Sequence, residues 1–253
     1  MKKEIRYFLT AILFYTRIPC PKWVDHSEEY LRGSSRYFPL VGVLVGALSA
    51  FIFWLLHYIL PNSLSISLSM VFSILLTGAL HEDGMADMCD GFGGGWTKEK
   101  ILTIMKDSRI GTFGAIGLIA VLGLKFISLN SISTSQIPLV LIAGNSISRF
   151  FAISFLYTQS YAREEGDSKI RPMAHTLSFQ DLIFTGFFGL APLIFFMDYH
   201  ILWILPILIM VRYYLAYMFK KWIGGYTGDC LGAVQQITEV LFYLGFIGLI
   251  RFH

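Results

Sequence analysis

Charged residues are scarce in this chain of 253 amino acids. Asp, Glu, Lys and Arg make up 15% of it, against 55% for hydrophobic residues, and the formal net charge is only +3. Soluble domains carry about 25% charged residues, so the composition excludes an ordinary soluble domain and favours a polytopic membrane protein. The small net charge gives no support for nucleic-acid binding. We expect one membrane domain over residues 1–253.

Paired cysteines and histidine zinc motifs are also missing. The three cysteines, Cys20, Cys89 and Cys230, form no C-x-x-C pair, so no disulfide framework is predicted. The segment "HEDGM" has Met85 where the H-E-x-x-H motif needs its second histidine. We therefore expect His81 to lie at a helix end or to orient a neighbour through a hydrogen bond, rather than to bind a metal.

Long apolar runs are plentiful, and seven of them approach the roughly 20 residues that a spanning helix needs. These runs are Phe38–Leu60, Ser63–Leu80, Gly111–Asn130, Ile137–Tyr157, Asp181–Phe196, Ile201–Phe219 and Leu231–Ile250. The shorter run Tyr7–Tyr15 predicts an interfacial or re-entrant helix. The predicted fold is therefore all-α, a polytopic helical membrane bundle.

Lysine and arginine are absent from every second connection between these runs. The connections around "PNS", "SISTSQ" and "MDYH" have none, whereas the segments 1–37, 81–110, 158–180 and 220–230 are basic. Positively charged loops stay in the cytoplasm. The chain is thus predicted to sit in the cytoplasmic membrane with its long polar segments, and any active site, facing the cytoplasm.

The segment 81–97 lacks basic residues but is rich in acids. Asp83, Asp87 and Asp90 are spaced i, i+4 and i+7, which places them within about 60° of one helix face. Like charges at this spacing repel each other, and carboxylate oxygens suit Mg²⁺, Mn²⁺ or Ca²⁺. We therefore predict that these three aspartates bind a metal ion, in preference to a solvated acidic helix face.

Three further polar motifs are predicted on the same side of the membrane. "MKDSRIGTFG" contains Lys106 and Arg109, "YAREEGDSKIRP" contains Arg163, and "GGYTGDCLGA" contains Thr227 and Asp229 before an apolar run. Backbone N–H groups at a helix start favour anions. Together with a metal, these groups predict a polyphosphate site, because phosphoryl transfer needs mainly positioning and charge neutralisation.

Three predicted spans each contain a basic residue. Lys125 lies near the outer end of its span and is expected to extend its ammonium group to the surface, and Arg212 can do the same at the cytoplasmic end. Arg149 lies roughly 12 Å from its span end, with Asn145 one turn away. An intramembrane arginine is a functional candidate by default. We predict that Arg149 binds substrate, with structural pairing as an equally weighted alternative.

These motifs resemble those of the cobalamin synthase family, the adenosylcobinamide-GDP ribazoletransferases. The resemblance rests on "HEDGMADMCDG", "MKDSRIGTFG", "YAREEG" and "GGYTGDCLGA", preceded by "FYTRIP" and "FPLVGVLVG", in order between residues 14 and 233. Glu82 departs from the family pattern, in which a Leu-type residue is more usual. It is expected to point away from the face that the aspartates share.

The resemblance implies a membrane-embedded, Mg²⁺-dependent enzyme of late cobalamin biosynthesis. α-Ribazole, or its 5′-phosphate, joins adenosylcobinamide-GDP and GMP leaves. Either Asp83 or Asp229 is expected to accept the proton of the attacking hydroxyl. The residues expected to bind the substrates are Lys106, Arg109, Arg149, Arg163 and Thr227. The small-molecule substrates and the lipid bilayer are the expected partners, while a homo-oligomer or contact with other enzymes of the pathway is left open.

Two other functions fit parts of the sequence. A CDP-alcohol phosphotransferase-like enzyme also holds metals on Asp-rich helices, but that pattern has Arg after Ala, whereas Asp87 follows Ala86 here. A transporter with an acidic gate requires ionisable groups along a path through the bilayer. The acidic residues here cluster on one predicted face, so the transferase is the first expectation.

Overall fold

The computed structural model describes residues 2–24, 27–163 and 177–252, and these residues are almost entirely helical. The helices are α1 (Lys2–Tyr15), α2 (Glu28–Ser34), η1 (Ser35–Tyr37), α3 (Phe38–His57), α4 (Asn62–Thr77), α5 (Leu80–Gly94), α6 (Lys98–Ile104), α7 (Thr112–Asn130), α8 (Ile137–Ile153), α9 (Phe155–Thr158), α10 (Phe179–Leu190), η3 (Ala191–Phe196), η4 (Tyr199–Trp203), α11 (Ile204–Ile223) and α12 (Gly228–Phe252).

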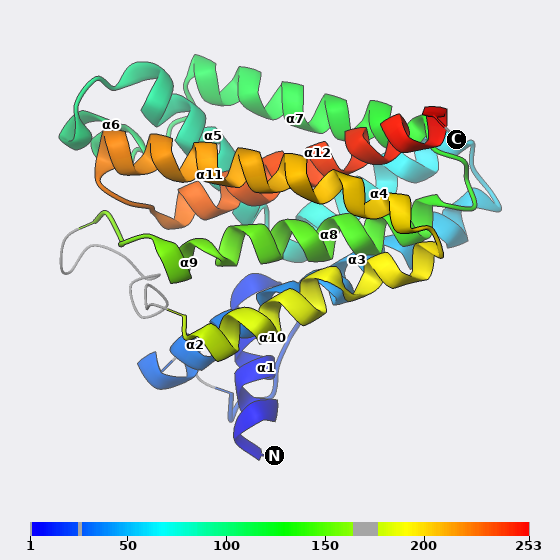
Figure 1. The fold of residues 1–253 in the computed structure, drawn as a ribbon, viewed down its shortest axis with the longest axis horizontal. Coiled ribbons are helices and arrows are strands. Elements are labelled where there is room, and N and C mark those ends of the chain that lie inside the picture. Colours follow the sequence, from blue (N-terminus) through cyan, green and yellow to red (C-terminus); the bar gives the residue numbers. More distant parts are fainter. Residues whose placement is uncertain (1, 25–26, 164–176, 253) are drawn as a thin grey trace.

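The predicted all-α membrane bundle is confirmed. Six stretches of the described chain are long and apolar enough to cross a membrane, and the bent pair α4–α5 is a seventh candidate. Most of these helices run side by side along the long axis of the molecule (Figure 1). The amino end of α7, the carboxyl end of α11 and the amino end of α12 all lie at the same end of the bundle, together with α6.

The second predicted span, Ser63–Leu80, corresponds to α4, which already ends at Thr77. The chain then turns by 87° into α5. The turn is made by Gly78 and Ala79, which both adopt left-handed backbone angles, with φ of 67° and 58°. Glycine adopts this conformation freely, whereas a residue with a Cβ rarely does. The turn makes the whole acidic segment a separate helix.

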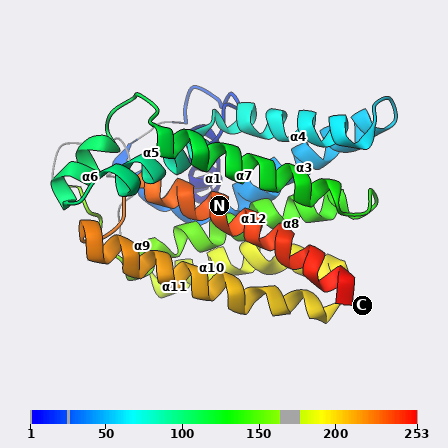
Figure 2. The ribbon, with the colours of Figure 1, turned by 90° about the horizontal axis from the view of Figure 1, so that it is seen from above.

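The centre of the bundle is formed by α8 and α12, which pack against each other, while α3 covers α8 and α5 covers α12. The view from above places α4 and α11 on opposite edges of the bundle (Figure 2). Large apolar side chains such as Ile119, Phe187 and Met210 are exposed on α7, α10 and α11. In a membrane protein these side chains contact lipid.

The short helix α1 crosses the direction of the bundle helices (Figure 1) and is not among the candidate spans. Arg36 forms ion pairs with Glu4 on α1 and with Asp181 on α10, so one guanidinium joins three parts of the chain. The Tyr37 hydroxyl and this guanidinium lower the pKa of Glu4. The amino-terminal helix is thereby fixed against the start of α3.

Candidate active site

Two of the three aspartates on the acidic face of α5 have carboxylates that pair with no other group of the described chain. Asp83 is exposed and Asp87 is half-buried. Within the described chain, neither carboxylate takes part in a recorded hydrogen bond or ion pair. The negative charges of Asp229, Asp83 and Asp90 act together on Asp87, and the positive charge of Arg163 opposes them. The structure therefore brings together acids from two helices, α5 and α12, with a cation from a third segment.

Asp90 has a different environment from the other two aspartates. Its carboxylate accepts hydrogen bonds from the backbone N–H of Gly111, at 2.7 Å, and of Gly114, at 2.8 Å. These amides lie at the amino end of α7, where helix N–H groups have no partner within the helix. A Cβ on either glycine would lie within 2.4 Å of this carboxylate. Asp90 thus ties α5 to α7.

The predicted three-aspartate metal site is not preassembled. Within the residues that the structure describes, no three Asp, Glu, His or Cys side chains lie close enough together to hold a metal ion. Both oxygens of Asp90 instead accept backbone N–H groups. The metal-binding roles of Asp83, Asp87 and Asp90 remain predictions.

Two glycines allow α5 and α12 to cross closely. A Cβ on Gly84 would lie 2.8 Å from the backbone oxygen of Asp229, and one on Gly232 would lie 3.2 Å from the backbone oxygen of His81. No ordinary side chain fits between backbones at the first of these distances. The crossing therefore places Asp229 directly against the helix that carries Asp83 and Asp87.

The third and fourth sequence motifs meet in a short β-bridge. The Tyr226 N–H donates to the oxygen of Ser160 at 3.0 Å, and the Ala162 N–H donates to the oxygen of Tyr226 at 2.9 Å. This pairing brings Arg163 to Asp229, with 2.6 Å between Nη2 and Oδ2, and both side chains are largely buried. The rest of the third motif, from Glu164 to Pro172, lies outside the described residues.

Thr227 is buried and immediately precedes α12. Its hydroxyl oxygen accepts the N–H of Cys230 at 3.3 Å, as an N-cap residue does, and its hydroxyl lies 3.4 Å from Oδ2 of Asp229. In this position Thr227 orders the first turn of α12 and the Asp229 carboxylate. Its predicted role as a direct substrate ligand is not tested.

Lys106 and Arg109 lie on the surface between α6 and α7. Arg109 forms a bidentate pair with Asp107, with 2.7 Å between Nη2 and Oδ2, and the hydrogen bonds from Arg109 lower the pKa of Asp107 to about 2. The pair therefore stays charged at neutral pH. No recorded contact joins Arg109 to the aspartates within the described residues, so its substrate-binding role also stays a prediction.

Arg149 is placed in the interior of the bundle. It is 1% exposed, and its Nη1 donates to both the backbone oxygen and the side-chain Oδ1 of Asn145, at 2.9 and 2.8 Å. Its guanidinium lies 5.6 Å from the Phe38 ring centre, and Glu239 and Glu82 act on its charge. These contacts are those of a structural residue, and the predicted contact with substrate is not tested.

A buried polar network continues from Arg149 and was not expected. Lys125 is 6% exposed and pairs with Glu239 at 2.8 Å instead of reaching the membrane surface. Arg212 also fails to extend outward, since it donates to the Ser154 oxygen at 3.1 Å. Glu82 accepts a 2.9 Å hydrogen bond from Gln236. The sequence signal for this network was Glu239, an acid inside an apolar span.

Comparison with known proteins gives one consistent family. A family model described as cobalamin-5-phosphate synthase matches residues 7–247. The chain is 45% identical over 246 residues to an adenosylcobinamide-GDP ribazoletransferase of Shewanella sp. (strain W3-18-1), covering 96% of this chain and 94% of the relative. It is 46% identical over 255 residues to a protein of the same name from Leptospira interrogans, covering 97% and 96%.

No solved structure matches the chain at a significant level. The family match nevertheless covers all four polar motifs, whose described parts lie at one end of the bundle. The relatives are also matched over nearly their whole length. The chain therefore belongs to the cobalamin-5-phosphate synthase family.

Proposed function

We propose that this membrane protein joins α-ribazole, or α-ribazole 5′-phosphate, to adenosylcobinamide-GDP and releases GMP. The names of the relatives support this reaction. The single structural observation that carries it is the Arg163–Asp229 pair, held against the face of α5 that carries Asp83 and Asp87. Acids and a buried arginine at one site suit a reaction in which charge on phosphate must be neutralised.

The proposal includes Mg²⁺, and the donor chemistry at the site fits this ion. Mg²⁺ keeps several waters and usually takes one or two carboxylates together with substrate phosphates. Asp83 and Asp87 supply two carboxylates that make no recorded hydrogen bond or ion pair within the described chain. We assign Mg²⁺ to these two first, with Asp90 holding the neighbouring helix. When bound, the ion neutralises charge on the pyrophosphate.

The basic residues of the other motifs neutralise and orient the phosphate groups of the substrates. Arg163 faces the departing GMP phosphate, and Lys106 and Arg109 attract the polyphosphate from the loop before α7. The ribose 3′-hydroxyl attacks the phosphorus on the cobinamide side. A new O–P bond then forms, the bond to the GMP oxygen breaks, and the hydroxyl proton passes to a carboxylate. We assign this proton to Asp229, which Arg163 holds through Oδ2 at 2.6 Å.

We place the site on the cytoplasmic face of the cell membrane. The connections that lack Lys and Arg lie at the opposite end of the bundle from the polar motifs. Positively charged connections favour the cytoplasmic side. The nucleotide-activated substrate would then be taken from the cytoplasm.

The direct test uses the purified chain in detergent. It is incubated with adenosylcobinamide-GDP and either α-ribazole or α-ribazole 5′-phosphate, with Mg²⁺ or with a chelator. We expect release of one GMP per joined product with Mg²⁺ and none with the chelator. Absence of GMP from a folded protein, or ion flux without turnover, would refute the transferase.

A further inference from the structure

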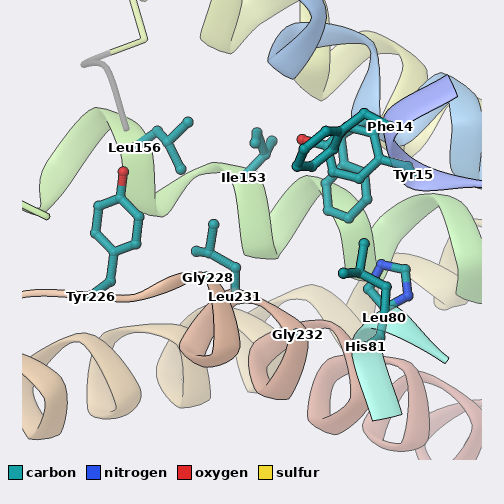
Figure 3. Close-up of a pocket in the computed structure, with 11 residues that line it drawn as sticks. Phe14, Tyr15, Leu80, His81, Ile153, Leu156, Tyr226, Gly228, Leu231 and Gly232 are labelled. Carbon is teal, nitrogen blue, oxygen red and sulfur yellow. The ribbon is translucent and has the colours of Figure 1, made fainter. Parts of the chain in front are cut away.

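A pocket of mostly apolar character lies between α1, α3, α5, α8 and the start of α12 (Figure 3). Its ring-bearing lining residues are Phe14, Tyr15, Phe38, His81 and Tyr226. The void between them measures about 540 Å³, a volume that includes its opening to solvent. Rings from four separate segments thus surround one space, an arrangement suited to a flat aromatic ligand.

The pocket adjoins the phosphate site along the chain. Gly228 belongs to its lining and is the immediate neighbour of Asp229, while His81 lies two residues before Asp83. The pocket and the acidic face are therefore carried by neighbouring residues of the same two helices, α5 and α12. The sugar of a ligand with its ring in the pocket needs to extend only from Gly228 to its neighbour Asp229 to meet a carboxylate.

One buried polar atom in the pocket lining lacks a partner. His81 is 3% exposed, and among the described residues no group forms a hydrogen bond with its Nε2. Its ring is held nearly parallel to Phe38, with 5.6 Å between ring centres. A buried polar atom without a hydrogen bond is costly. A ligand nitrogen or oxygen within reach of Nε2 would remove that cost.

We propose that this pocket binds the benzimidazole base of the α-ribazole substrate, with His81 Nε2–H donating to the unsubstituted ring nitrogen. The inference rests on the proposed function. It adds that the base of the nucleoside binds in the pocket, while the phosphates bind at the acidic face. The base lies among the rings of the pocket, and the ribose extends from it past Gly228. The 3′-hydroxyl is then presented to Asp229.

The other flat base in the reaction, guanine, fits the pocket poorly. Guanine has several hydrogen-bond donors and acceptors along its edge, and each one buried without a partner is unfavourable. Among the side chains of the described lining residues, His81 Nε2 is the single buried nitrogen or oxygen without a partner. Benzimidazole needs only one hydrogen bond and is otherwise apolar. The pocket therefore favours the nucleoside over the GDP portion.

The test measures KM for each substrate separately in the purified protein. His81→Phe keeps the ring and removes its nitrogens, and we expect KM for α-ribazole to rise roughly 3- to 20-fold. Leu156→Phe narrows the pocket and should raise it at least roughly tenfold. KM for adenosylcobinamide-GDP should stay within about twofold in both. Free benzimidazole should compete with α-ribazole and not with adenosylcobinamide-GDP.

A matched control is Leu124→Phe, the same exchange on the lipid-exposed side of α7, which should leave both KM values unchanged. Unchanged KM for α-ribazole in His81→Phe, or a rise in KM for adenosylcobinamide-GDP instead, overturns the pocket assignment while wild-type GMP release still supports the reaction. If the wild-type protein releases no GMP, the proposed function itself has failed. If Leu156→Phe does not fold, His81→Phe and the benzimidazole competition decide.

Discussion

Asp90 lies on the same helix as Asp83 and Asp87 and follows them at helical spacing, yet its contacts are different. Both of its oxygens accept N–H groups from the start of α7. The spacing of the three aspartates could be predicted from the sequence, because it depends only on helix geometry. The contact with α7 depends on how two helices meet after a turn, and no local pattern contains that information.

Replacing Asp90 tests this structural role. Asp90→Ala leaves the first amides of α7 without a side-chain acceptor, so we expect it to lower the free energy of unfolding by about 1–3 kcal/mol. The Mg²⁺ concentration for half-maximal GMP release should change little. Thermal unfolding and a Mg²⁺ titration measure the two effects. Unchanged stability together with a large loss of Mg²⁺ affinity would make Asp90 a ligand rather than a cap.

Lys125 and Glu239 provide a second test at the level of single residues. Their 2.8 Å pair is buried within the bundle, so Lys125→Met leaves an uncompensated acid and should destabilise the protein by about 3–5 kcal/mol. Adding Glu239→Gln removes that acid, so the double variant should be more stable than Lys125→Met alone. Unfolding of the wild-type protein, Lys125→Met, Glu239→Gln and the double variant in detergent measures this. Strictly additive losses would mean that the pair does not interact.

At the scale of elements, the sequence predicted the order and type of the helices well. The starts of α3 and α8, at Phe38 and Ile137, and the end of α7 at Asn130 coincide with the predicted run boundaries. Apolar length determines these spans, and apolar length is visible in sequence. The turn at Gly78 and Ala79 was missed because a left-handed alanine opposes local preference. Tertiary contacts decide the conformation there.

The crossing of α5 and α12 can be tested through its glycine. Gly84→Ala adds a Cβ only 2.8 Å from the Asp229 backbone oxygen, so the helices must separate. We expect a loss of about 1–3 kcal/mol in stability and a marked fall in GMP release. Gly123→Ala is the matched control, since a Cβ at Gly123 meets nothing within 4 Å. Equal behaviour of the two variants in thermal unfolding and turnover would contradict the close crossing.

At the scale of the whole molecule, the fold gathers sequence motifs that lie far apart. Segments near residues 90, 110, 160 and 228 meet at one end of the bundle through the Asp90 cap, the β-bridge and the Arg163–Asp229 pair. The alternation of basic and uncharged connections predicted this common side. It did not predict which residues pair, because those pairings depend on the bridge between Tyr161 and Tyr226.

The predicted orientation can be measured by labelling single cysteines. In a variant with Cys20, Cys89 and Cys230 changed to serine, Lys98→Cys on α6 should react with an impermeant maleimide only from the cytoplasmic side. Ser135→Cys, in the uncharged connection between α7 and α8, should react only from the outside. Both positions are exposed. The reverse pattern in sealed vesicles and intact cells would place the acidic face on the wrong side of the membrane.

The central claim is that Asp83 and Asp87 of α5 hold the metal that assists phosphoryl transfer. The most direct measurement compares GMP release by the wild-type protein and Asp87→Asn across a range of Mg²⁺ concentrations, with Glu99→Gln on exposed α6 as the control. We predict wild-type turnover for the control and a loss of roughly 100-fold or more for Asp87→Asn at ordinary Mg²⁺. A folded Asp87→Asn protein with near-normal turnover would contradict the account.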